Sequence, residues 1–97
     1  MPSAYVIAQI DVKDPEAYKE YQAGAPAVVA AYGGEFAVRG GQIETMEGDP
    51  PAGRVVVIKF PSVEKAKAFY HAEEYADLLK MRLSLTESRL FIVEGAD

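Results

Sequence analysis

The chain has 97 residues, of which 49% are hydrophobic, and its formal net charge is −5. This composition is sufficient for a packed core, so we expect one folded domain over residues 1–97. The ten basic residues are scattered among fifteen acidic ones, which argues against a nucleic-acid-binding protein. The chain has no cysteine, which excludes disulfides and thiolate metal sites. No apolar run approaches the roughly 20 residues of a membrane-spanning helix, and no signal-peptide pattern is present, so we expect a cytoplasmic protein without a membrane partner.

The first third of the chain is predicted to form a strand and a helix. Residues 4–12 are mostly β-branched or aromatic, as is typical of a short strand. Asp14 and Pro15 suit the cap and the first position of a helix. Pro26 lacks an amide proton, which predicts a kink or a restart of that helix. The pair Gly33-Gly34 predicts the end of the helix, because glycine adopts the left-handed conformation at low cost.

The middle of the chain is predicted to contain two strands separated by a loop. Residues 35–47 indicate a strand that is broken, or carries a bulge, at Gly40-Gly41. Residues 48–53 are rich in glycine and proline and predict an exposed turn. Residues 54–60 form the strongest strand pattern in the chain.

The rest of the chain predicts a second helical region and a last strand. Ser62 suits a helix cap, the helical pattern is interrupted near His71, and residues 88–94 indicate the final strand. The order strand, helix, strand, strand, helix, strand predicts an α+β fold of ferredoxin-like βαββαβ type. In this fold an antiparallel four-stranded sheet carries two helices on one face.

The predicted sheet is apolar on both faces. In the third strand Val55 and Val57 point to one face, while Val56 and Ile58 point to the other. Two helices cover only one face, so the second would be an exposed apolar patch large enough to need a partner. The simplest partner is a second copy stacked about a two-fold axis. We therefore predict a homodimer formed by sheet-to-sheet packing.

Three blocks of the sequence resemble a bacterial family known as domain of unknown function 1330. The first block is residues 31–36 with 38–41, AYGGEF and VRGG. The second is residues 57–62, VIKFPS, followed by Ala66, by AFYH at 68–71 and by Glu74-Tyr75, and the third is residues 91–95, FIVEG. The resemblance implies the dimeric α+β barrel superfamily. That superfamily includes cofactor-independent quinol monooxygenases, muconolactone isomerases, haem chlorite dismutases and sensory domains of transcription regulators. Because one fold serves many functions, the resemblance transfers no activity.

Arg39 is the first candidate for a catalytic role. Its guanidinium can hold a carboxylate or enolate oxygen with two parallel hydrogen bonds. The adjacent Gly40 and Gly41 would let a ligand approach the backbone closely, so both are candidate substrate-binding residues. The alternative for Arg39 is a salt bridge, within the chain or between subunits, to one of the many carboxylates.

His71 is the second candidate for catalysis, as the only histidine of the chain. Histidine changes charge near neutral pH and is suited to act as a general base. The alternative is a helix C-cap, or a polar residue packed where the helix breaks. If His71 acts on a substrate, its predicted neighbours are Tyr70, Tyr75 and Arg82.

Tyr32, Tyr70, Tyr75 and Arg82 are predicted to bind the substrate. Each tyrosine has a large apolar ring with a hydroxyl at its tip, which suits a pocket for a small aromatic ligand. The same residues are also ordinary core residues of amphipathic helices. Arg82 follows Tyr75 by seven residues on nearly the same helical face. It either points into the cleft or pairs with a carboxylate in solvent.

The sequence leaves three classes of function open, the last of which is a structural role of the dimer, with the pocket filled by side chains. The first is an enzyme of monooxygenase or isomerase type that acts on a small, partly apolar acid or phenol, with Arg39 holding an oxygen and His71 moving a proton. The second is a non-catalytic domain that binds or senses a small molecule in the same pocket. No metal or other cofactor is expected, because metal-ligand patterns and phosphate-binding loops are missing from the sequence.

Overall fold

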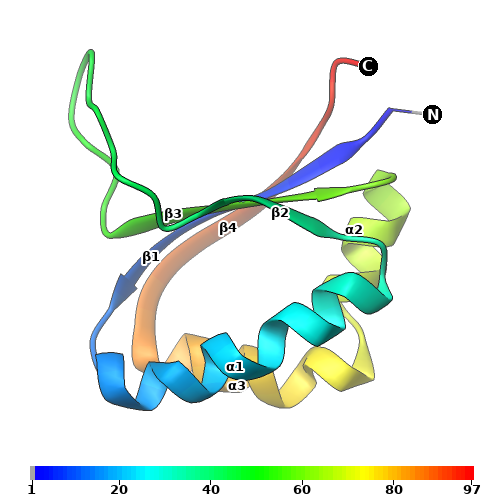
Figure 1. Cartoon of the computed structure of the whole chain (residues 1–97), viewed down its shortest axis with the longest axis horizontal. Helices are drawn as coiled ribbons and strands as arrows, with labels where there is room; N and C mark the ends of the chain where they lie inside the picture. Colours follow the sequence, from blue (N-terminus) through cyan, green and yellow to red (C-terminus); the bar gives the residue numbers. More distant parts are fainter. Residues whose placement is uncertain (1) are drawn as a thin grey trace.

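A computed structural model describes residues 2–97 as one four-stranded antiparallel sheet with three helices on one face (Figure 1). The strand order in the sheet is β2-β3-β1-β4. This order confirms the predicted ferredoxin-like βαββαβ fold, with the second helical region split in two. The strands are β1 (Ala4–Val12), β2 (Glu35–Arg39), β3 (Arg54–Phe60) and β4 (Thr86–Glu94), and the helices are α1 (Pro15–Ala31), α2 (Val63–Tyr70) and α3 (Glu73–Leu85).

Side-chain caps begin α1 and α2 where the sequence predicts them. Asp14 Oδ1 accepts a hydrogen bond of 3.1 Å from the backbone N–H of Ala17, and Ser62 Oγ accepts one of 3.2 Å from that of Lys65. Each cap satisfies a backbone donor that has no partner inside the helix. The helix α1 continues through Pro26, so the restart considered from the sequence does not occur.

The break in the second helical region is where the sequence places it. The helix α2 ends at Tyr70 and α3 begins at Glu73. The backbone N–H of His71 donates to Lys67 O at 3.0 Å and so closes the last turn of α2. His71 therefore occupies the C-cap position that was the alternative to a catalytic role.

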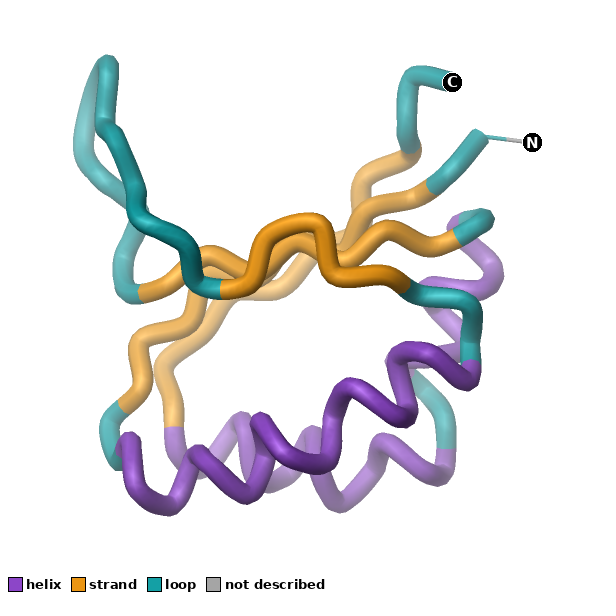
Figure 2. The backbone as a smooth tube through the Cα atoms, in the orientation of Figure 1, coloured by secondary structure: helices purple, strands orange, loops and turns teal. Residues whose placement is uncertain are grey.

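The strand predicted over residues 35–47 is shorter than expected. The strand β2 ends at Arg39, and residues 40–53 form an exposed loop that projects away from the helices (Figure 2). Residues beyond Arg39 have no neighbouring strand to pair with, so their β propensity is not realised. The irregularity in pairing also lies earlier than predicted, between Phe36 and Val38 rather than at the two glycines. A bulge of this kind re-aims the side chains that follow it.

The core lies between the helices and the face of the sheet that they cover. Along β1 the side chains of Ala4, Val6, Ala8 and Ile10 are at most 4% exposed and face the helices. The other face of the sheet has no covering element, and its apolar side chains remain open to solvent (Figure 1). The large apolar side chains most exposed on this face have exposed fractions of 41–45% and belong to Val38, Phe91 and Val93. The two apolar faces predicted from the sequence are therefore both present.

Within residues 2–97, none of the helices combines the length and the apolar character needed to cross a membrane.

We expect Gly53→Ala to destabilise the protein and Gly41→Ala to leave it almost unchanged. Gly53 has a φ of +69°, and a Cβ there would lie 2.6 Å from the carbonyl carbon of Ile10, which is backbone and cannot rotate away. The left-handed conformation alone costs a residue with a Cβ about 1–2 kcal/mol. A Cβ at Gly41 meets no atom within 4 Å, so that change stays within about 0.5 kcal/mol. Urea unfolding of both variants measures the difference, and equal stabilities would contradict the described geometry of Gly53.

Candidate functional site

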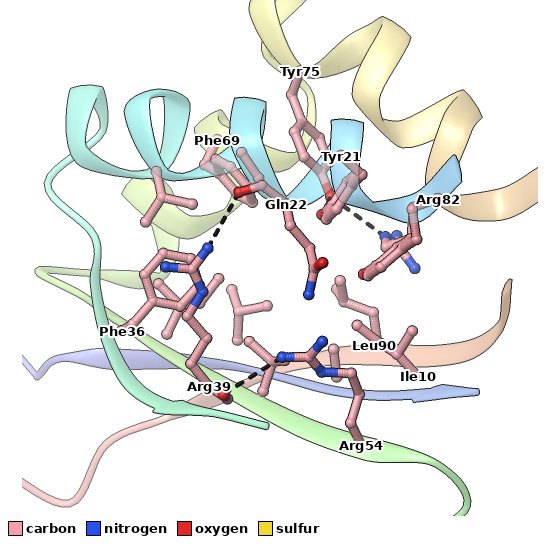
Figure 3. A pocket seen from close by; sticks show the side chains of 17 residues that line it. Ile10, Tyr21, Gln22, Phe36, Arg39, Arg54, Phe69, Tyr75, Arg82 and Leu90 are labelled. Atoms are coloured by element: carbon pink, nitrogen blue, oxygen red, sulfur yellow. Dashed lines mark hydrogen bonds between the residues drawn. The ribbon is translucent and has the colours of Figure 1, made fainter. Parts of the chain in front are cut away.

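A cavity of about 50 Å³ lies between the helices and the covered face of the sheet (Figure 3). Strands β1, β3 and β4 supply an apolar floor that includes Ile10, Val56 and Leu90. The cavity reaches the surface beside Arg39, whose side chain is exposed. No aspartate, glutamate or histidine is among the lining residues within the described part of the chain. The polar side chains that line it are Tyr18, Tyr21, Gln22, Arg39, Arg54, Tyr75 and Arg82.

Arg82 is the most deeply buried charge in the site, with only 2% of its surface exposed. Its Nη1 donates a hydrogen bond of 2.6 Å to Ser88 Oγ, and its Nε donates a longer one of 3.4 Å to Tyr75 Oη. Tyr75 and Arg82 lie two turns apart on one face of α3. Ser88 lies close because β4 begins directly after α3, at Thr86.

The charge of Arg82 has no acidic partner. Among residues 2–97, no carboxylate lies within 4.0 Å of its guanidinium. Burial by itself lowers the pKa of Arg82, but the hydrogen bond to Tyr75 and the charge interactions with Tyr75, Tyr21 and Tyr70 together outweigh it, so the pKa is raised. The guanidinium therefore stays cationic in an apolar cavity. An uncompensated buried charge is costly, and a bound anion would offset that cost.

A pair of tyrosine hydroxyls extends the hydrogen bonding from Arg82. The hydroxyl oxygens of Tyr21 and Tyr75 are 2.5 Å apart, so one donates to the other. The Tyr18 ring stacks on the Tyr21 ring with centroids 5.0 Å apart. Burial, followed by the Tyr75 hydroxyl, raises the pKa of Tyr21 far above its ordinary value. Burial also raises the pKa of Tyr18, although the charges of Arg54 and Arg82 oppose the shift.

Two further arginines lie at the mouth of the cavity. Arg39 Nη2 donates to the backbone oxygen of Gln22 at 3.2 Å, and Arg39 Cζ lies 4.6 Å from the centre of the Phe36 ring. Arg54 Nη2 makes a long contact of 3.5 Å with the backbone oxygen of Arg39. The Nε of Arg54 is buried and has no hydrogen-bond partner among the described residues. Gly40, with a φ of +71°, leaves room for this guanidinium, since a Cβ there would lie 2.8 Å from Arg54 Cζ.

Three of the residues predicted from the sequence meet in this cavity, namely Arg39, Tyr75 and Arg82. Within residues 2–97 Arg39 makes no salt bridge, and it contacts a backbone oxygen and an aromatic ring instead. A salt bridge of Arg39 to a second subunit stays a prediction. Arg82 points into the cavity, so its alternative pairing with a carboxylate in solvent does not occur. The bulge in β2 explains the position of Arg39, because it leaves Arg39 paired with Val56 on the helix-covered face.

Five other predicted site residues do not line the cavity: Tyr32, Gly40, Gly41, Tyr70 and His71. The His71 side chain is exposed, and its ring lies edge-on against Tyr70 with centroids 5.2 Å apart. Tyr32 directs its hydroxyl to the Glu74 carboxylate, with both oxygens at 3.3 Å. The structure thus separates His71 from Arg39 and Arg82.

Four polar lining residues were not identified as site residues from the sequence: Tyr18, Tyr21, Gln22 and Arg54. The two tyrosines belong to the apolar stripe of α1, but a stripe does not distinguish a cavity wall from a filled core. The sequence does contain a signal that could have identified Arg54 as a site residue. It is two residues before Val56 in β3, so strand alternation places it on the covered face.

The comparisons with known proteins concern the family and the fold. The model of a family described as domain of unknown function (DUF1330) matches residues 3–96. The crystal structure of methylated RPA0582 protein has a TM-score of 0.79 at 20% identity, over 99% of this chain and 82% of that one. A structure of RPA0582 from Rhodopseudomonas palustris, described as a protein of unknown function, has a TM-score of 0.78 at 21% identity, over 99% and 84% of the chains.

A third solved structure belongs to a protein with a named activity. SnoaB, described as a cofactor-independent oxygenase from Streptomyces nogalater, has a TM-score of 0.73 at 11% identity, over 100% of this chain and 96% of that one. No curated protein matches the chain. At these identities the likeness shows the fold alone, which is that of the dimeric α+β barrel class.

The buried hydroxyl of Tyr21 makes stability sensitive to high pH. Because its pKa is raised in the folded protein, its contribution is complete below about pH 10, where the unfolded tyrosine ionises, and is lost as the pH rises further. We expect the free energy of unfolding to fall above about pH 10, by at most about 1.4 kcal/mol per pH unit for this group. Tyr21→Phe reduces that slope in urea unfolding measured across this range. A variant as pH-dependent as the unchanged protein would contradict the burial of this hydroxyl.

Proposed function

The chain belongs to the DUF1330 family, and we propose that it binds a small, partly apolar organic acid or phenol as its anion. The proposed site is the cavity between the helices and the sheet. The observation that carries the proposal is the buried guanidinium of Arg82, which faces an apolar cavity without a carboxylate partner. A ligand oxygen bearing negative charge would accept charge-assisted hydrogen bonds from Arg82 and balance its positive charge.

The shape of the cavity limits the ligand. A volume of about 50 Å³ is less than the ~150 Å³ of a cavity that takes up benzene. Pentanoate has seven non-hydrogen atoms and benzene six, so a short aliphatic acid, like an aromatic acid or phenol, requires side chains that line the cavity to move. Arg39 is exposed, and its movement would break its contacts with the Gln22 oxygen and the Phe36 ring.

An enzyme that works without a cofactor is the first form of this proposal. Arginine in an apolar cavity stabilises negative charge that develops on a bound phenol or enol, and such electrostatic stabilisation is a large part of catalysis. Arg39 and Arg82 are the residues we propose for this role, with Tyr75 in contact with the ligand. The similar fold of SnoaB, a cofactor-independent oxygenase, supports this form of the proposal.

A non-catalytic binding or sensing domain is the second form, and one observation favours it. Within residues 2–97, the cavity is lined by no histidine or carboxylate that would accept a proton near neutral pH. The role of His71 as a general base thus has no geometric support from the cavity. Recovery of a bound ligand unchanged after incubation favours the second form, and conversion of the ligand favours the first.

We further propose that a second copy of the chain covers the open face of the sheet. Cross-strand pairing joins its apolar side chains into one patch, because Ile7 lies opposite both Val57 and Phe91, and Tyr5 lies opposite Val93. An apolar patch across a whole sheet is typical of an interface. Sheets stacked about a two-fold axis would bury it in both copies at once.

We expect pentanoate to bind and pentan-1-ol, which has the same chain length without the charge, to bind at least about tenfold more weakly. Arg82→Met should remove this preference for the acid. Lys80→Met, at an exposed lysine on α3 that does not line the cavity, is the control and should retain it. Isothermal titration of the full chain measures the three affinities.

The comparison of acid and alcohol needs no variant, so it remains informative if Arg82→Met fails to fold. Arg82→Lys then serves as the second variant, because it keeps the charge but loses the fork of donors. Equal binding of the acid and the alcohol by the unchanged protein would sink the proposal.

We expect the unchanged protein to be a dimer and Phe91→Glu to be a monomer at micromolar concentration. Phe91 is 45% exposed on the open face, and a carboxylate there would be buried without a partner in the stacked sheets. Leu83→Glu is the control, since Leu83 is 57% exposed on α3. Native mass spectrometry reports the oligomer, and a Phe91→Glu dimer would contradict the proposed interface.

A further inference from the structure

Arginines from three different elements line this same cavity: Arg39 from β2, Arg54 from β3 and Arg82 from α3. None of them makes a salt bridge within residues 2–97. The binding of a single anion requires only one of these charges. The other two therefore need a separate explanation.

The three guanidinium groups lie apart from one another around the cavity (Figure 3). The Arg82 guanidinium lies with Tyr75 and Ser88, as its hydrogen bonds show. The Arg54 guanidinium contacts the backbone oxygen of Arg39, whereas the Arg39 guanidinium lies against the Gln22 oxygen of α1. The floor of the cavity is apolar.

The Arg54 guanidinium has an unused donor. Arg54 Nε is buried and has no partner, although buried donors in proteins are nearly always hydrogen-bonded. The absence of a side chain at Gly40 leaves room for the Arg54 guanidinium at this position. A negatively charged ligand acceptor would satisfy the Nε and balance the charge of Arg54.

Arg54 and Arg82 both border the space that a ligand would occupy. The charges of Arg54 and Arg82 both act on the hydroxyl of Tyr18, whose pKa they lower against the larger effect of burial. Tyr18 is 3% exposed and lines the same cavity. A small molecule beside Tyr18 would thus experience both charges.

We propose that the preferred ligand is a short dicarboxylate, with one carboxylate at Arg82, the other at Arg54, and an apolar chain between them. This inference rests on the proposed anion-binding function and specifies its substrate class. The cavity volume of about 50 Å³ favours the shortest chain that reaches both arginines, and the side chains around the cavity must move to admit it. The two carboxylates explain why both Arg54 and Arg82 line the cavity without a carboxylate partner within residues 2–97.

The test compares diacids with monoacids of equal chain length. Isothermal titration of the full chain at about pH 7.5, where both carboxyl groups are ionised, gives affinities for glutarate and pentanoate, and for succinate and butanoate. The second pair ensures that one unsuitable chain length does not hide the effect. We expect the diacid to bind at least tenfold more tightly than its monoacid in at least one pair.

Arg54→Met should bring that ratio close to one, because the second carboxylate loses its partner. Arg39→Met should lower the ratio less, because the Arg39 guanidinium lies against the Gln22 oxygen, and Lys80→Met, at an exposed lysine of α3, is the control that should leave the ratio unchanged. If Arg54→Met fails to fold, Arg54→Gln, which also removes the charge, provides the same comparison. A ratio of one or less in both pairs, with the monoacids still bound, overturns the dicarboxylate inference alone. If none of the four acids binds, the proposed function itself fails.

Discussion

The hydrogen bonds from the buried Arg82 guanidinium to Tyr75 and Ser88 are the interaction on which the site depends. Moving a guanidinium from water into the protein interior costs several kcal/mol of folding free energy, unless hydrogen bonds and an opposite charge compensate it. Here the partners are two neutral hydroxyls, so donors are satisfied while the positive charge is not balanced. The hydroxyl of Thr86 also donates to the Arg82 backbone oxygen at 2.6 Å, which ties the end of α3 to the start of β4. The arginine is thereby fixed in position before any ligand arrives, as binding of an anion with little reorganisation requires.

The packing of the two long helices explains why a cavity forms beside this arginine. Gly24 of α1 lies against Leu78 of α3, where a Cβ would come within 3.0 Å of Leu78 Cδ2, so the helices approach closely there. At Tyr21 and Tyr75 the same two helices are joined instead through the tips of large side chains. Below them, Ala8 contributes a small side chain to the sheet. Large groups at the helices and a small one at the sheet leave space that a core of uniform leucines would fill.

The sequence predicted features that depend on neighbouring residues better than those that depend on distant ones. The caps at Asp14 and Ser62 and the helix break at His71 follow from local preferences, and the structure has them. Residues 42–47 have strand-like composition, but composition does not state whether a partner strand exists. The prediction for His71 rests on the chemistry of its side chain and says nothing about its position in the fold. The prediction for Tyr75 and Arg82 rests on their helical spacing, which is geometric, and the structure has the two side chains in contact.

The bulge in β2 connects the two faces of the sheet in a way that no local pattern predicts. Val38 pairs with Val57 and lies among the exposed apolar residues of the open face, whereas Arg39 pairs with Val56 and lines the cavity. Adjacent residues thus serve the proposed dimer interface and the proposed ligand site. A second copy packed on Val38 restricts the strand that carries Arg39, and Arg39 in turn contacts α1 through the Gln22 oxygen. On the proposals made here, dimer formation therefore helps to hold the mouth of the cavity in position, which a monomer would leave free at the edge of its sheet.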